Sequence, residues 1–147
     1  MDQFEQQVFL LAEDDESHVF LMKEAFAKAG VANPLRVVAN GEEAIGYLKG
    51  LPPYQDRAEN PLPFALLLDL KMPRKDGFEV LEWVRQQPIL KRLVVIVLTS
   101  SNQATDANRA YDLGANFYLT KPGSFTDLVE MIKCLRDWLR LNHFPTC

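Results

Sequence analysis

Polar side chains that could bind a phosphoryl group follow four apolar runs of the sequence. Glu13 and Asp14 follow one run, and Asp69 ends the run "LLLD". Thr99 follows "LVVIVL", and Lys121 follows "NFYLT". Carboxylates that share a crevice repel one another unless a cation lies among them, and Mg²⁺ is a cation that favours oxygen ligands. Together with a lysine and a hydroxyl, they are the groups that stabilise a transferring phosphoryl group.

Five apolar runs of 5 or 6 residues alternate with five amphipathic runs of helical length. Apolar runs of this length are typical of strands that are buried on both faces of a sheet. The alternation predicts an α/β fold, a flavodoxin-like doubly wound (βα)5 three-layer sandwich with a parallel sheet in the order 2-1-3-4-5. The carboxyl ends of its strands share one edge, so the polar residues should converge there. The predicted strands are 8–13, 35–39, 64–69, 93–98 and 116–120, and the predicted helices are 17–29, 41–50, 76–87, 103–113 and 125–141.

Length and composition predict one domain over residues 1–147, with no output domain. The net charge of −4 and the lack of a lysine and arginine cluster argue against a nucleic-acid partner. The longest apolar run, 93–98, is too short to cross a membrane, and the acidic N-terminus is not a secretory signal. We therefore expect a cytoplasmic protein without a membrane partner, in which Cys134 and Cys147 are reduced, structural thiols.

Taken together, the motifs resemble the receiver domains of response regulators in two-component signalling, over about residues 7–141. The motifs are "AEDD", "LLLDLKMPRKDGFEVL", "VIVLTS" and "FYLTKP". The resemblance implies that Asp69 accepts a phosphoryl group from a partner histidine kinase or a small acyl phosphate. The chain would then switch its surface to signal to a partner protein or to dimerise. It would not turn over an external substrate, but would catalyse Mg²⁺-dependent transfer to its own aspartate and slow autodephosphorylation.

The resemblance assigns a metal site to three carboxylates and one backbone carbonyl. Glu13 and Asp14 match the metal-binding pair of the family, with Asp14 as the direct ligand and the longer Glu13 reaching the metal through water. Asp69 and the backbone carbonyl of Lys71 complete the protein ligands of Mg²⁺, with Mn²⁺ as an alternative. Lys71 also occupies one of two positions that tune the lifetime of the phosphoryl group, and its side chain is a candidate partner for Glu13 in the unmodified protein.

The resemblance also assigns the groups that bind and sense the phosphoryl group. Lys121 pairs with the phosphoryl oxygens, and its bond to Pro122 is expected to be cis. Thr99 moves toward the same oxygens, and Tyr118, the switch aromatic, then turns inward. Ser101 occupies the second position that tunes the lifetime of the phosphoryl group.

The closer similarity is to stand-alone receivers of the cyanobacterial phytochrome response regulator type. It rests on the long loop 50–63 and on the ending "LRDWLRL", and it implies a phytochrome-type photoreceptor kinase as the partner. Receivers of this kind commonly pair through the face from the fourth helix to the fifth. The last helix carries a second apolar stripe, which is either a dimer or partner face or is covered by the chain end through Phe144. This stripe consists of Met131, Cys134, Trp138 and Leu141.

Other functions share parts of this pattern. A phosphatase of the dehalogenase-like class would carry a second aspartate at the position of Lys71. A nucleotide-binding domain would carry a glycine-rich loop after the first strand, where "AEDDES" stands. A non-phosphorylated pseudo-receiver that acts as a protein-interaction module is the alternative function. His18 follows the acidic cluster, and we expect it to be solvated in the first turn of a helix rather than to bind a metal.

Overall fold

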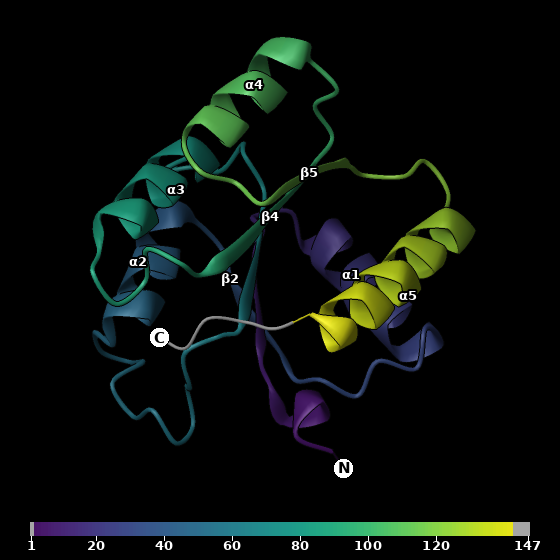
Figure 1. Ribbon diagram of the computed structural model, residues 1–147, viewed down its shortest axis with the longest axis horizontal. Helices are drawn as coiled ribbons and strands as arrows, with labels where there is room; N and C mark the ends of the chain where they lie inside the picture. Colours follow the sequence, from purple (N-terminus) through teal and green to yellow (C-terminus); the bar gives the residue numbers. More distant parts are fainter. Residues whose placement is uncertain (1, 143–147) are drawn as a thin grey trace.

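Five parallel strands form one sheet in the order β2-β1-β3-β4-β5, which confirms the predicted order (Figure 1). The computed structural model describes residues 2–142. A short 3-10 helix, η1 (Phe4–Gln6), precedes the sheet. The strands are β1 (Phe9–Ala12), β2 (Leu35–Val38), β3 (Ala65–Leu68), β4 (Val94–Thr99) and β5 (Phe117–Thr120). The helices are α1 (Glu16–Lys28), α2 (Gly41–Lys49), α3 (Gly77–Gln86), α4 (Ala104–Asp112) and α5 (Phe125–Leu141).

Helices cover both faces of the sheet, with α2, α3 and α4 on one face and α1 and α5 on the other (Figure 1). Successive side chains of a strand point to opposite faces. In β1, Leu10 and Ala12 pack into the core under α2 and α3, whereas Phe9 and Leu11 pack into the core under α1 and α5. β1 and β3 are apolar throughout because each of them contributes side chains to both cores. Within residues 2–142, no helix is both long and apolar enough to cross a membrane.

The strand ends differ slightly from the predicted bounds. The observed ends determine whether each polar site residue lies within a strand or in the loop that follows it. β1 ends at Ala12 and β3 ends at Leu68, so Glu13 and Asp69 are the first residues beyond their strands. β4 continues through Thr99, whose carbonyl accepts a hydrogen bond from the N–H of Lys121 at 2.7 Å. The acidic and basic groups therefore lie in loops, and the hydroxyl is fixed within the sheet.

A close approach between backbones fixes the loop that follows β3. A Cβ atom at Gly77 would lie 2.3 Å from the carbonyl oxygen of Asp69 and 2.8 Å from the Cα of Leu70. The N–H of Gly77 donates to the carbonyl of Leu70 at 2.9 Å. Asp76 and Glu79 form a reciprocal capping box at the start of α3. The start of this helix therefore holds the backbone of Asp69 in place.

The long loop 50–63 is held against the end of α2 by side-chain hydrogen bonds. The guanidinium of Arg57 donates to the carbonyl oxygens of Tyr47 and Leu48, at 2.8 Å in each case. These carbonyls belong to the last turn of α2, where backbone acceptors lack partners within the helix. The hydroxyl of Tyr47 donates to the carbonyl of Pro61 at 2.8 Å. The loop is therefore an ordered extension of α2.

Candidate functional site

The predicted carboxylates converge at the carboxyl edge of the sheet. Glu13 and Asp69 are buried, with 3% and 7% of their surface exposed, and Asp14 is exposed. One carboxylate oxygen from each of the three lies within 4.8 Å of the others. The N–H of Asp69 donates to the carbonyl of Ala12 at 3.1 Å, which ties the two loops together. Three carboxylates at this spacing form a set of hard oxygen ligands that fits a divalent cation.

Lys121 compensates the charge of the two buried carboxylates. Its Nζ contacts Oε1 of Glu13 and lies 3.0 Å from Oδ2 of Asp69. The side chain of Lys121 is 15% exposed. An uncompensated carboxylate at this depth would be costly, so the lysine makes the buried position of Asp69 tenable.

Burial and charge act in opposite directions on the pKa values of this cluster. Burial raises the pKa of Glu13; the hydrogen bond from Lys121 offsets part of this effect, and the nearby charge of Asp69 adds to it. Burial alone would lower the pKa of Lys121, but the hydrogen bond to Glu13 and the charge of Asp69 outweigh it. The net pKa of Lys121 is therefore raised, and its ammonium form is retained.

Lys71 does not form the expected pair with Glu13, which contacts Lys121 instead. The side chain of Lys71 is exposed, whereas its backbone N–H donates to Oδ1 of Asp69 at 3.3 Å. The physical reason is burial. Glu13 is only 3% exposed, so it is within reach of the half-buried Lys121 that follows β5 and not of the exposed side chain of Lys71. The backbone N–H of Lys71 therefore lies next to the carboxylate, and the role of its carbonyl as a metal ligand stays a prediction.

The predicted switch residues form a chain of hydrogen bonds beside the site. Thr99 is fully buried, and its Oγ1 accepts from the N–H of Ser101 at 3.4 Å. The hydroxyl of Tyr118 donates to the carbonyl of Ser101 at 2.9 Å, and its ring packs on the core under α3. The hydroxyl of Ser101 donates to Asp106 of α4 at 2.6 Å. Tyr118 therefore already faces the loop between β4 and α4, whereas the sequence predicts this inward position only after phosphorylation.

The bond between Lys121 and Pro122 is trans, so the predicted cis bond is wrong. Within residues 2–142, the cis bond is the one between Pro52 and Pro53. The trans form of a bond to proline is favoured by about 0.5–1 kcal/mol. With this form Lys121 already reaches both buried carboxylates, so its position does not require the cis form.

His18 is the site residue that the sequence failed to predict. Its Nδ1 lies 3.0 Å from Nζ of Lys121 and 3.5 Å from Oε1 of Glu13. As expected, His18 lies in the first turn of α1, and its side chain is 42% exposed, but it also contacts the site because this helix starts directly after the acidic pair, with Asp15 as its N-cap. The first turn of α1 therefore lies over the site. A polar residue three positions after an aspartate, which is a preferred N-cap residue, was the signal available in the sequence.

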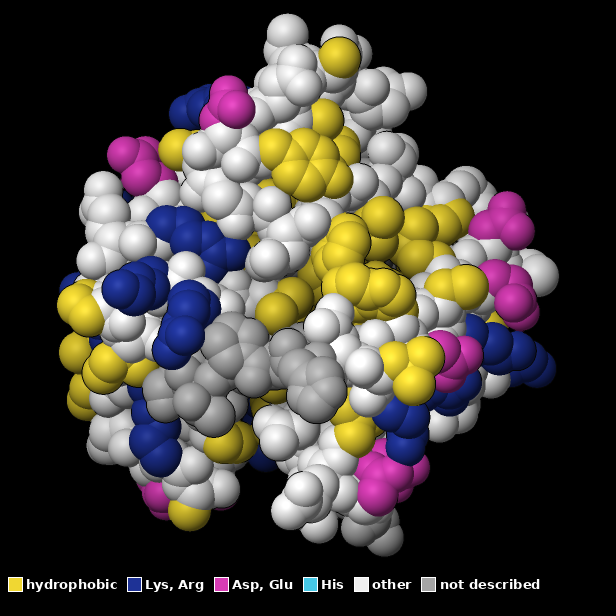
Figure 2. All heavy atoms as spheres, in the orientation of Figure 1, with side chains coloured by type: hydrophobic (Ala, Val, Ile, Leu, Met, Phe, Trp, Pro, Cys, Tyr) yellow, Lys and Arg dark blue, Asp and Glu magenta, His cyan; other side chains and the backbone are white. Residues whose placement is uncertain are grey.

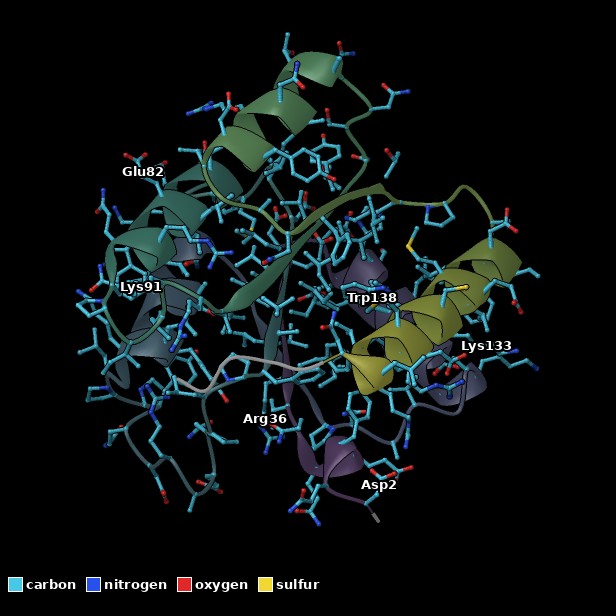
Figure 3. All side chains as sticks on the ribbon, viewed as in Figure 1. Asp2, Arg36, Glu82, Lys91, Lys133 and Trp138 are labelled. Atoms are coloured by element: carbon cyan, nitrogen blue, oxygen red, sulfur yellow. The ribbon has the colours of Figure 1, made fainter. Side chains whose placement is uncertain are left out.

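The predicted second stripe of α5 is exposed in part and lies beside β5. Cys134 is exposed, Trp138 is 46% exposed and Leu141 is 83% exposed, whereas Met131 is half-buried and packs on the core under α1. Figure 3 places Trp138 between α5 and β5. Hydrophobic side chains gather over these two elements in Figure 2.

The ring of Trp138 packs edge to face on Phe117 of β5, with 4.7 Å between centroids. Phe125, the first residue of α5, is 40% exposed. Phe144 and Cys147 lie outside the described residues, so covering of the stripe by the chain end stays a prediction.

Residues 9–133 match the response regulator receiver domain. The chain belongs to this family. Response regulator Rcp1 of Synechocystis is 35% identical to the receiver, over 94% of this chain and 92% of Rcp1. The solved structure of RPA3017, a response regulator in red light signalling of R. palustris, has a TM-score of 0.91 at 38% identity, covering 96% of this chain and 99% of RPA3017.

A second solved structure, the phosphorylated cyanobacterial phytochrome response regulator RcpA, has a TM-score of 0.87 at 34% identity. The match covers 96% of this receiver and 99% of RcpA. The chain is therefore a receiver domain of a two-component response regulator and a homologue of phytochrome response regulators, in a family characterised by phosphorylation on aspartate.

Proposed function

We propose that Asp69 of this receiver is the phosphoryl acceptor. A carboxylate oxygen attacks phosphorus, the bond from phosphorus to the donor's imidazole nitrogen or acyl oxygen breaks, and the donor keeps that electron pair. The observation that carries this assignment is the buried carboxylate of Asp69, 3.0 Å from Nζ of Lys121 and clustered with Glu13 and Asp14. Incorporation of one phosphoryl group that requires Asp69 is the experiment that tests it.

We propose that Glu13, Asp14, Asp69 and the carbonyl of Lys71 hold Mg²⁺, with Mn²⁺ as the alternative. The Mn²⁺-bound form of the relative Rcp1 supports a divalent cation in this type of receiver. When bound, the ion supplies positive charge that offsets the charge on the transferred group. Lys121 supplies a further positive charge from the side of β5.

The switch follows from the hydrogen bonds beside the site. Phosphorylation adds about −1.5 to −2 charge units and three acceptor oxygens. The hydroxyl of Thr99 then turns toward the new oxygens, which changes its contact with the N–H of Ser101. The hydroxyl of Tyr118 donates to the carbonyl of Ser101, so a movement of Thr99 changes the position of both Tyr118 and the loop before α4. Lys71 and Ser101 tune the phosphoryl lifetime, the latter through its hydrogen bond to Asp106 of α4.

The partner that supplies the phosphoryl group is, in this proposal, a phytochrome-type histidine kinase in the cytoplasm. Support comes from two relatives, which are described as a cyanobacterial phytochrome response regulator and a response regulator in red light signalling. The receiver itself catalyses the transfer to Asp69 and slow hydrolysis of the aspartyl phosphate. Its output is a change of surface at α4, β5 and α5.

We further propose that the exposed stripe of α5 pairs two copies of the receiver. Trp138→Glu should convert the dimer to a monomer in light scattering, because it places a carboxylate where an indole ring packs on Phe117. Ile89→Glu is the matched control, since Ile89 is 66% exposed and follows α3, away from α5. A Trp138→Glu protein of unchanged mass would exclude this dimer face.

A further inference from the structure

The ammonium of Lys121 faces three acceptors, and one of them is not a carboxylate. Oε1 of Glu13 and Oδ2 of Asp69 account for two of its three N–H groups. Nδ1 of His18, 3.0 Å from Nζ, is placed to accept the third. An ammonium group has no lone pair, so this contact requires a free lone pair on Nδ1, and the ring proton of the neutral imidazole lies on Nε2.

The position of His18 is fixed by the start of α1. Asp15 is the N-cap of this helix and accepts from the N–H groups of Ser17 and His18, at 2.8 Å and 3.4 Å. The imidazole lines a cavity of about 250 Å³ together with Glu13, Lys121 and apolar side chains of α1. Its side chain is 42% exposed, so it lies at the mouth of the site rather than in the core.

We propose that His18 is a positioning residue, which keeps the ammonium group of Lys121 directed toward the phosphoryl group on Asp69. This inference rests on the proposed function. The contacts of Glu13 and Asp69 with the lysine change in that function, since the first carboxylate takes part in metal binding and the second carries the phosphoryl group. His18 takes neither role, so its acceptor remains available to the ammonium in both states. The lysine is thereby kept from turning into the adjacent cavity.

Two variants distinguish the effect of the Nδ1 acceptor from the effect of the side-chain volume. His18→Leu removes the acceptor and keeps an apolar side chain, whereas His18→Asn keeps an acceptor oxygen close to the position of Nδ1. Phosphorylation by acetyl phosphate with Mg²⁺, followed by intact mass, should be about 5- to 10-fold slower in His18→Leu, as expected for one hydrogen bond to a charged group at a half-exposed position. His18→Asn should restore most of the rate. Lys23→Met, an exposed change on α1, is the matched control.

The same comparison in a Lys121→Met background tests whether His18 acts through the lysine. His18→Leu should have no further effect there, because the group that it positions is absent. A His18→Leu protein with the wild-type rate would overturn the proposal. So would an asparagine variant as slow as the leucine variant, or a leucine effect that persists without Lys121.

A measurement without phosphorylation keeps this inference separate from the proposed function. In a long-range ¹H–¹⁵N spectrum of the unmodified protein, His18 should have the Nε2–H tautomer, and its Nδ1 signal should shift in Lys121→Met. An unshifted Nδ1 signal would show that the contact is absent and would overturn the proposal. If the wild-type protein took up no phosphoryl group, the proposed function would fail, and the role of His18 in phosphorylation would fail with it.

Discussion

Replacing Lys121 with methionine should slow phosphorylation of the receiver by about 100-fold or more, the loss expected when one preorganised donor to a developing charge is removed. Methionine keeps most of the side-chain length but provides neither a charge nor an N–H group. Lys121 contacts Glu13 and lies 3.0 Å from Asp69, so the variant also leaves two buried carboxylates without their cation. The measurement is the initial rate of labelling by acetyl phosphate at saturating Mg²⁺.

Lys133→Met is the matched control for this change. Lys133 lies on α5, is 43% exposed and pairs with Glu130 at 3.4 Å (Figure 3). The same loss of one positive charge at this surface position should leave the labelling rate unchanged, because surface charges contribute little at such a distance in salt. Equal rates for Lys121→Met and the wild-type protein would exclude the lysine from the reaction.

The largest loss of stability is expected from Arg85→Met. The guanidinium donates five hydrogen bonds, all to uncharged oxygens, and joins the end of α3 to the loops before β4 and β5. Two go to the carbonyl of Gly114, at 2.6 and 2.9 Å, and one goes to the carbonyl of Leu93 at 2.7 Å. Burial of the guanidinium lowers the pKa of Arg85.

Methionine fills part of the space but leaves these backbone acceptors without donors. The free energy of unfolding should fall by about 2–4 kcal/mol, since each buried acceptor that is left unpaired costs about 1–3 kcal/mol and the effects of neighbouring groups are not additive. Urea unfolding followed by circular dichroism measures the loss. Lys91→Met, a change at an exposed position of the adjacent loop, should change the stability by less than about 0.5 kcal/mol. An Arg85→Met protein as stable as this control would contradict the account.

The layout of the site could be predicted from the sequence because it depends on topology. In a parallel sheet the carboxyl ends of all strands share one edge, so residues at the ends of β1, β3, β4 and β5 had to converge. The apolar and amphipathic runs are local signals, and their alternation predicted the doubly wound strand order. The N-cap of α1 is also a local feature, since aspartate is a preferred N-cap residue and Asp15 takes this position.

What the sequence did not predict depends on how elements pack. His18 reaches Lys121 because of the rotation of α1 on the sheet, which no local pattern encodes. The inward position of Tyr118 depends on an acceptor in another loop, the carbonyl of Ser101. The predicted pair of Lys71 with Glu13 was reasonable by charge alone. Because Glu13 is buried, however, it pairs with Lys121 instead.

The central claim is that Asp69 takes up one phosphoryl group in a reaction that depends on a divalent cation. The most direct test is the intact mass of the receiver after incubation with acetyl phosphate, with Mg²⁺ and with excess chelator. Asp69→Asn is measured beside it, with Asp112→Asn, an exposed change at the end of α4, as the matched control. We expect the mass of one phosphoryl group in the wild-type and Asp112→Asn proteins with Mg²⁺ only, and none in Asp69→Asn. No gain in the wild-type protein, or an equal gain in Asp69→Asn, would contradict the claim, and the former would favour a non-phosphorylated protein-interaction module.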